Sequence, residues 1–126
     1  MADVTFKSGN PAKIKHTPAA GNIALGQVVL IGTVTANTGG AGAIAGVASR
    51  PITNNTRGAL DAGGGVYEGT NLNNAADGAK VYWDDTNNKF TTASTNNAVF
   101  GHIVSGGGGG ANTACRVLHN PLYGGN

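Results

Sequence analysis

Charged, aromatic and cysteine side chains are all scarce in this chain. Only 11% of its residues are charged, seven are aromatic, and Cys115 is its single cysteine. A lone cysteine excludes a disulfide within the chain and is typical of a protein made in a reducing compartment. The chain also lacks a run of 18 apolar residues and a secretory signal pattern, so we expect a protein made in a cytoplasm, with no membrane partner.

The few charges are unevenly placed. Residues 1–16 contain three lysines and one aspartate, a balance of +2, whereas positive and negative charges cancel over residues 17–126. A nucleic-acid interface normally needs a basic face that neutralises several phosphates, and three lysines do not provide one. We therefore expect no specific nucleic-acid partner, and the first segment is either a solvated tail or an arm that contacts an acidic surface.

Small residues take the place of bulky ones. Gly, Ala, Asn and Thr account for 69 of the 126 residues. The length fits one domain, but apolar burial has to offset about 1–2 kcal/mol of backbone entropy for each ordered residue. An isolated subunit is therefore expected to be marginally stable, and association with copies of itself or with a partner would bury further surface.

Short apolar runs between turn residues indicate an all-β fold. About eight short strands at spacings near ten residues predict a small β-barrel or sandwich. The strands are expected over residues 27–35, 42–48, 66–69, the two arms of a hairpin at 78–92, 98–104 and 114–119. Residues 50–64 are expected to form a loop, and residues 71–78 could hold a single helical turn.

The first eighteen residues have no sustained period and contain two prolines, Pro11 and Pro18. The residue before a proline is pushed toward extended geometry. We therefore predict an extended amino-terminal arm over residues 1–18 and a single β domain over residues 19–126.

The hairpin at residues 78–92 contains the only tryptophan of the chain. Neighbouring residues of a strand point to opposite faces, so one of Tyr82 and Trp83 is expected to fill the core while the other shields an interface. An exposed ring could instead bind a sugar. Asp84 and Asp85 follow directly and are expected to cap backbone amides of the turn.

The motifs that would support catalysis are incomplete. The glycines at 106–110 lack the Lys and Ser/Thr of a phosphate-binding P-loop and precede a strand. Nothing in the sequence places Cys115 beside His102 and Asp84, and a small buried thiol is the ordinary outcome for a cysteine in a strand. The histidines are not at metal-ligand spacing. We therefore expect no enzyme, no cofactor and no metal.

Three stretches resemble the small capsid cement (head decoration) proteins of tailed bacteriophages. They are residues 15–20 with 25–32, residues 78–92, and residues 100–104 with 115–118. The most specific part is the Val-Tyr-Trp-Asp run of the hairpin, and residues 36–65 depart from the family in detail. Sequences of this family are often labelled RecA/RadA-type recombinases, but the missing P-loop argues against that activity here.

The resemblance implies a structural subunit of the virion, made in the bacterial host cytoplasm. It would bind the outer surface of the phage head, commonly as a homotrimer, and bridge major capsid protein subunits so that the expanded shell is stabilised. The alternative is a tail or fibre β-module that binds host glycans.

Two groups of residues are expected to carry the cement function. An arm that contacts the capsid would use Phe6, Lys7, Lys13, Ile14 and Lys15. The subunit interface or core would use Val28, Val29, Leu30, Ile31, Tyr82, Trp83, Phe100 and Ile103. Deleting residues 1–16 is expected to leave a folded oligomer that no longer binds shells.

Overall fold

The computed structural model describes residues 3–32 and 43–121 of the chain. Within these ranges it contains ten strands and no helix, and hence none able to cross a membrane. The strands are β1 (Thr5–Gly9), β2 (Lys13–His16), β3 (Val28–Gly32), β4 (Ala43–Ala48), β5 (Gly58–Asp61), β6 (Gly65–Asn71), β7 (Lys80–Asp84), β8 (Lys89–Thr91), β9 (Ala98–Ser105) and β10 (Thr113–His119).

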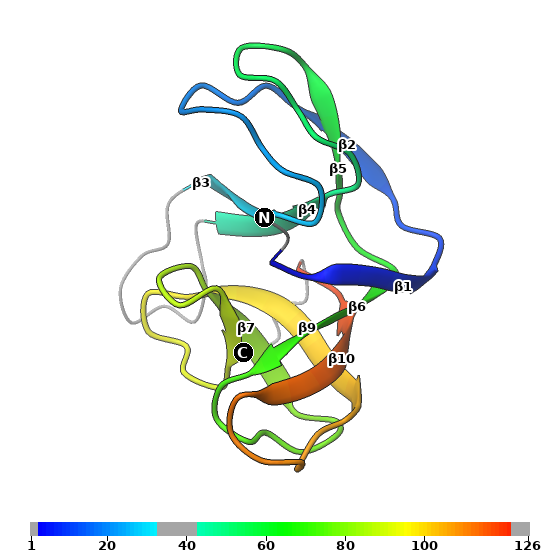
Figure 1. Ribbon diagram of the computed structural model, residues 1–126, viewed down its shortest axis with the longest axis vertical. Helices are drawn as coiled ribbons and strands as arrows, with labels where there is room; N and C mark the ends of the chain where they lie inside the picture. Colours follow the sequence, from blue (N-terminus) through cyan, green and yellow to red (C-terminus); the bar gives the residue numbers. More distant parts are fainter. Residues whose placement is uncertain (1–2, 33–42, 122–126) are drawn as a thin grey trace.

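The strands form two sheets, with the four-stranded sheet above the six-stranded one in Figure 1. The six-stranded sheet has the order β1-β6-β10-β9-β7-β8, and the four-stranded sheet has the order β2-β5-β4-β3. Strand β8 also pairs with β6, through Asn71 and Phe90, so β6 to β10 close into a barrel. Strand β1 pairs with the first half of β6, outside this ring. The predicted all-β class with a small barrel is confirmed.

The barrel is built around a few large rings, because the chain has few other bulky residues. Trp83 from β7, Phe90 from β8 and Phe100 from β9 are all fully buried. The centroid of the Phe90 ring lies 5.3 Å from that of Trp83 and 4.8 Å from that of Phe100, and both pairs meet edge to face. Such aromatic pairs stabilise a core beyond the area that they bury. Small residues then complete the packing around them.

The apolar run of β3 is divided between two cores. Val28 and Leu30 pack against the barrel core, whereas Val29 and Ile31 pack against a smaller cluster made of Ile23, Ala48, Ile52 and Leu60. Alternate residues of a strand point to opposite faces, so a strand covered on both sides reads as a continuous apolar run. The four-stranded sheet therefore lies between the barrel and this second cluster.

Gly101 allows β9 and β10 to approach closely in the middle of the barrel. It is paired with His119 of β10 on one side and Val81 of β7 on the other. A Cβ atom at this position would lie 1.8 Å from the carbonyl oxygen of Leu118. The absence of a side chain is therefore a condition for closing the barrel here.

Two local predictions from the sequence are wrong. Residues 58–61 form β5 inside the segment that was expected to be a loop, and together with β1 and β2 in the predicted arm it brings the number of strands to ten. The helical turn expected over residues 71–78 is not formed, because the Asn71 side chain binds both the N–H and the carbonyl oxygen of Ala75. Asn74 between them has a left-handed φ of 57°. The expected extension of β3 through residues 33–35 lies outside the described residues.

His119 is a buried polar residue of the barrel core. Its Nε2 lies 2.7 Å from the carbonyl oxygen of Ala45, and within the described residues its Nδ1 has no hydrogen-bond partner. The ring packs against Phe100, with centroids 4.5 Å apart. Desolvation by burial lowers the pKa of His119, although the hydrogen bond to Ala45 and the charge of Asp61 act in the opposite direction. The ring is therefore held neutral in the folded protein.

The free energy of unfolding is expected to decrease as the pH falls below about 6.5. The unfolded chain binds a proton at the ordinary histidine pKa of 6.5, while the buried His119 ring resists protonation, so acid favours the unfolded state over the interval between the two pKa values. Denaturant unfolding measured between pH 7.5 and 5 tests this in the wild type, in His119→Gln and in the control His16→Gln. The His119 variant should show the smaller pH dependence; equal slopes for all three proteins would contradict the prediction.

Candidate functional site

The predicted amino-terminal arm is incorporated into the two sheets. Strand β1 pairs with β6 and β2 pairs with β5, and each is the outermost described strand on its side of its sheet. Just before β1, Val4 is 2% exposed in the barrel core, and the Asp3 carboxylate accepts a hydrogen bond of 2.9 Å from the Val28 N–H. The segment is therefore held in place by β1, by β2 and by the two residues before β1, Asp3 and Val4.

Strand β1 is nevertheless the least covered strand of the fold. All five of its residues are exposed, and Phe6 keeps 49% of its surface accessible. Besides its backbone pairing with β6, it is held by an edge contact between the rings of Phe6 and Tyr67, whose centroids lie 5.7 Å apart. An edge strand with unpaired N–H and carbonyl groups can accept a strand from another chain. This makes β1 the first element of a candidate binding surface.

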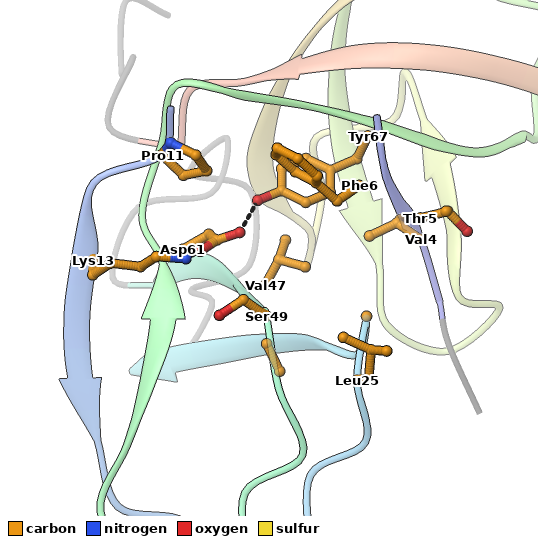
Figure 2. A pocket seen from close by; sticks show the side chains of 12 residues that line it. Val4, Thr5, Phe6, Pro11, Lys13, Leu25, Val47, Ser49, Asp61 and Tyr67 are labelled. Atoms are coloured by element: carbon orange, nitrogen blue, oxygen red, sulfur yellow. Dashed lines mark hydrogen bonds and ion pairs between the residues drawn. The ribbon is translucent and has the colours of Figure 1, made fainter. Parts of the chain in front are cut away.

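A hollow of about 370 Å³ lies beside β1, between the barrel and the four-stranded sheet. We call it the apolar hollow, because most of the side chains that point into it in Figure 2 are apolar. They come from segments far apart in the sequence, and they include Val4, Phe6, Pro11, Leu25, Val47 and Tyr67. Leu25 is 56% exposed at its rim.

A buried carboxylate closes one end of the apolar hollow. Asp61 of β5 is 2% exposed, forms an ion pair with the Lys13 ammonium of β2 and accepts a hydrogen bond from the Tyr67 hydroxyl of β6 (Figure 2). Burial, together with the hydrogen bond to Asp61 and its charge, raises the pKa of Tyr67 above its ordinary value, so this hydroxyl stays a donor. The three side chains link the two sheets.

A second hollow of about 480 Å³ adjoins the first, and we call it the basic hollow. The two share Lys13 and Ser49 as lining residues. The other residues that line the basic hollow are Arg50, Pro51, Ile52, Gly58 and Ala59. Arg50 is exposed, and among the described residues it forms no ion pair.

The first and second halves of the chain differ in net charge. Residues 1–65 contain five Lys or Arg and two Asp, a balance of +3, whereas residues 66–126 contain three Lys or Arg and four Asp or Glu, a balance of −1. One of the two aspartates in the first half is the buried Asp61, which is already paired with Lys13. The half of the chain that contains β1 to β5 is therefore the half suited to an acidic partner.

The five residues expected to form the capsid-binding arm lie in different surroundings. Phe6 and Lys13 meet at the apolar hollow, and Lys7 and Lys15 are exposed on β1 and β2. Ile14 instead packs against the second cluster, on the face of the four-stranded sheet that points away from the barrel. Leu25, Arg50 and Asp61 complete the surface without having been predicted, since nothing local distinguishes a leucine between Ala and Gly, an arginine in a bend or an aspartate that ends a strand.

The eight residues expected at the core or subunit interface lie mostly inside the subunit. Val28, Leu30, Trp83, Phe100 and Ile103 belong to the barrel core or pack against it, and Val29 and Ile31 pack against the second cluster. Tyr82 is not part of either cluster and is 9% exposed. The Nζ atom of Lys80 lies 5.5 Å from the centroid of its ring. Neither hairpin ring is exposed as a platform for stacking a sugar.

The hairpin aspartates have hydrogen-bond partners within the hairpin, and Cys115 is a buried free thiol. Asp84 accepts hydrogen bonds from the N–H groups of Thr86 and Asn87, as predicted. The same prediction is wrong for Asp85, which instead accepts a hydrogen bond of 3.3 Å from the Trp83 indole. Burial raises the pKa of Asp84, but its hydrogen bonds outweigh that effect and leave the pKa below its ordinary value. Cys115 is buried, and desolvation first, then the charges of Asp77 and Glu68, raise its pKa to about 11. Its thiol is therefore protonated at neutral pH.

The glycine loop at residues 106–110 binds its own neighbours. The N–H groups of Gly107 and Gly110 donate to the side chains of Asp77 and Asn74, at 2.7 and 2.8 Å. A P-loop needs such N–H groups free for phosphate and a lysine beside them, whereas here one of them is bound to a carboxylate. Among the described residues there is also no group of three side chains suited to a metal ion.

These features define a β-barrel module with an open edge strand and a surface suited to another macromolecule. The family model of the phage cement proteins matches residues 7–118, which contain β2 to β9 in full and most of β1 and β10. The chain belongs to the phage cement protein family, and the resemblance seen in its sequence is confirmed. It is accordingly a protein associated with a phage capsid, and a structural family of this kind favours a role without catalysis. No curated protein and no solved structure gives a significant match.

Proposed function

We propose that this protein binds the outer surface of a phage head and bridges neighbouring major capsid subunits, which stabilises the expanded shell. The observation that carries the proposal is β1, a strand that is exposed along its whole length at a sheet edge and is followed by lysines. An extended segment of the capsid protein would pair with this edge and bring its acidic side chains near Lys7 and Lys15. The backbone pairing supplies affinity, and the charges select the partner.

Tight attachment would come from several copies acting together. A single edge contact worth about 4 kcal/mol corresponds to millimolar affinity, whereas linked copies bind at high effective concentration. We propose a homotrimer for this reason. Because Val28 to Ile31 pack inside the subunit, the outer barrel face is the better candidate for subunit contacts. It carries Val104 and Leu118, which are 48% and 39% exposed.

Reversing the charge of the two exposed lysines is expected to release the protein from heads. Phage heads prepared without this protein are mixed with purified wild type or with the double variant Lys7→Glu/Lys15→Glu, and bound protein is quantified after sedimentation. We expect at least tenfold weaker binding of the double variant, together with loss of the added heat resistance of the heads. Lys89→Glu on the barrel hairpin is the control for a single charge reversal, and Lys7→Glu and Lys15→Glu are also measured singly for comparison with it.

Two results would contradict the proposal. One is undiminished binding of the double variant, and the other is binding that is lost equally in the Lys89→Glu control. A wild type that does not bind heads at all would overturn the function itself. Thermal unfolding of each variant alone shows whether its fold is retained.

A further inference from the structure

We propose that the apolar hollow and the basic hollow form one two-part site for an extended segment of the capsid protein. A bulky apolar side chain of that segment would enter the apolar hollow beside Phe6 and Leu25. A carboxylate of the same segment would lie in the basic hollow against Arg50 and Lys13. The inference rests on the proposed function and specifies the chemistry of the capsid segment.

The exposure of two side chains supports the apolar part of the site. The described residues include four exposed large hydrophobic side chains, and the two with the largest exposed fractions, Leu25 at 56% and Phe6 at 49%, both line the apolar hollow. Val4 and Val47, which are almost fully buried, form its inner wall. Exposed apolar side chains gathered around a concave surface mark an interaction site, whereas single scattered ones do not.

Charge complementarity supports the acidic part. Lys13 and Arg50 both line the basic hollow, and its described lining contains no acidic residue. In the described lining of the neighbouring apolar hollow the one carboxylate is that of Asp61, which is 2% exposed and already bound by Lys13 and Tyr67. Among the described residues, Arg50 therefore has no carboxylate as an ion-pair partner, and its planar set of donors matches an incoming carboxylate.

The position of the two hollows favours a polypeptide as the occupant. They share Lys13 and Ser49 as lining residues, and the apolar hollow lies along the open edge strand β1. A strand that pairs with an edge presents side chains at regular intervals to pockets beside it. A nucleic acid would use the cations but would leave Leu25 and the apolar wall without a matching group.

Two variants and two matched controls test the site on heads that lack this protein. Leu25→Ser removes the exposed apolar rim and Arg50→Glu reverses the charge of the basic hollow. Leu72→Ser, at a partly exposed leucine directly after β6, and Lys89→Glu make the same changes on the barrel side of the molecule, away from the proposed subunit contacts. Each replaced side chain is at least partly exposed, so the fold is expected to be retained; thermal unfolding checks this. We expect head binding to weaken at least tenfold for the first two variants and less than twofold for the controls.

The outcomes separate this inference from the proposed function. Wild-type binding with no loss in Leu25→Ser or Arg50→Glu would overturn the two-part site and leave the cement function intact. Absence of wild-type binding would overturn both.

A cross-link identifies the occupant directly. A photoreactive phenylalanine analogue is placed at position 25, the assembled heads are irradiated, and mass spectrometry identifies the attached peptide. We expect a capsid-protein peptide with a bulky apolar residue and an Asp or Glu within a few positions of it. A cross-link to DNA, to another copy of this chain, or to a capsid segment without an acidic residue would overturn the inference.

Discussion

Replacing Gly101 with alanine is expected to prevent the barrel from closing. The new methyl carbon would lie 1.8 Å from the carbonyl oxygen of Leu118 and 3.1 Å from the backbone nitrogen of Asn120. Both obstacles are backbone atoms of the β10 side, so no side-chain rotation relieves the clash. Overpacking of a core commonly costs 1–3 kcal/mol, and a clash with a paired strand is expected to exceed about 3 kcal/mol. For a domain of marginal stability this amounts to loss of folding.

The matched control for this substitution is Gly109→Ala. Gly109 lies in the loop between β9 and β10, has no left-handed φ, and would place its methyl carbon in ordinary contact, 3.4 Å from the Thr113 hydroxyl. Its free energy of unfolding should change by less than about 1 kcal/mol, because alanine also restricts the unfolded chain. Denaturant unfolding of the two variants beside the wild type measures the difference. Similar stability of Gly101→Ala and Gly109→Ala would refute the steric argument.

Replacing Lys13 with methionine is expected to lower the free energy of unfolding by about 2–3 kcal/mol. The change keeps most of the apolar part of the side chain but leaves the buried Asp61 carboxylate without its cation. Removing one partner of a fully buried ion pair costs about 3–5 kcal/mol. Lys13 itself is half exposed, so water partly replaces it and the smaller figure applies.

A double-mutant cycle isolates the energy of this pair. Asp61→Asn removes the charge while its amide oxygen can still accept the Tyr67 hydroxyl, so the double variant Lys13→Met/Asp61→Asn should be more stable than Lys13→Met alone. Lys15→Met on the same strand, whose side chain is exposed, controls for the loss of a lysine. A double variant no more stable than Lys13→Met would show that the loss arises from packing and not from the unpaired charge.

The elements that could be predicted from the sequence are those whose signal is local. Strand β10 alternates strictly between exposed and buried residues, and the hairpin of β7 and β8 combines alternation with an Asp/Asn-rich turn. Strand β5 has neither property. It is four residues long, begins with glycine and ends with the buried Asp61, and it is held in place by its pairing with β2 and β4. Tertiary contacts that no local pattern encodes determine it.

The extended character of the first residues was predictable, but their attachment was not. Proline and the lack of helical period indicate extended geometry, whereas pairing with β6 and β5 depends on residues about fifty positions away. The structure therefore changes the expectation for a deletion of residues 1–16. That deletion also removes Val4 from the core and Lys13 from Asp61, so it is expected to destabilise the domain as well as release it from heads. Point variants on the exposed side chains test binding more cleanly.

The candidate site could be predicted only in part for the same reason. The excess of lysine near the amino terminus left two possibilities, a solvated tail or an arm that contacts an acidic surface, and Phe6 and Lys13 were expected to take part in such an arm. The hollow itself needs Leu25 from one turn, Val47 from β4 and Asp61 from β5 to meet. Each of these residues is ordinary in its own segment, and only the fold brings them into one surface.

The parallel contact between β6 and β8 has a further consequence for how the molecule behaves when it is concentrated. A ring of strands that is joined to itself has no terminal ladder on which another copy could grow, so the barrel cannot seed fibrils through β7, β9 or β10. Two copies that meet at the barrel face can bind each other only through contacts between their side chains. Strand addition is therefore confined to edge strands outside this ring, such as β1. Pairing with the capsid protein and contacts between copies of this chain then use different surfaces.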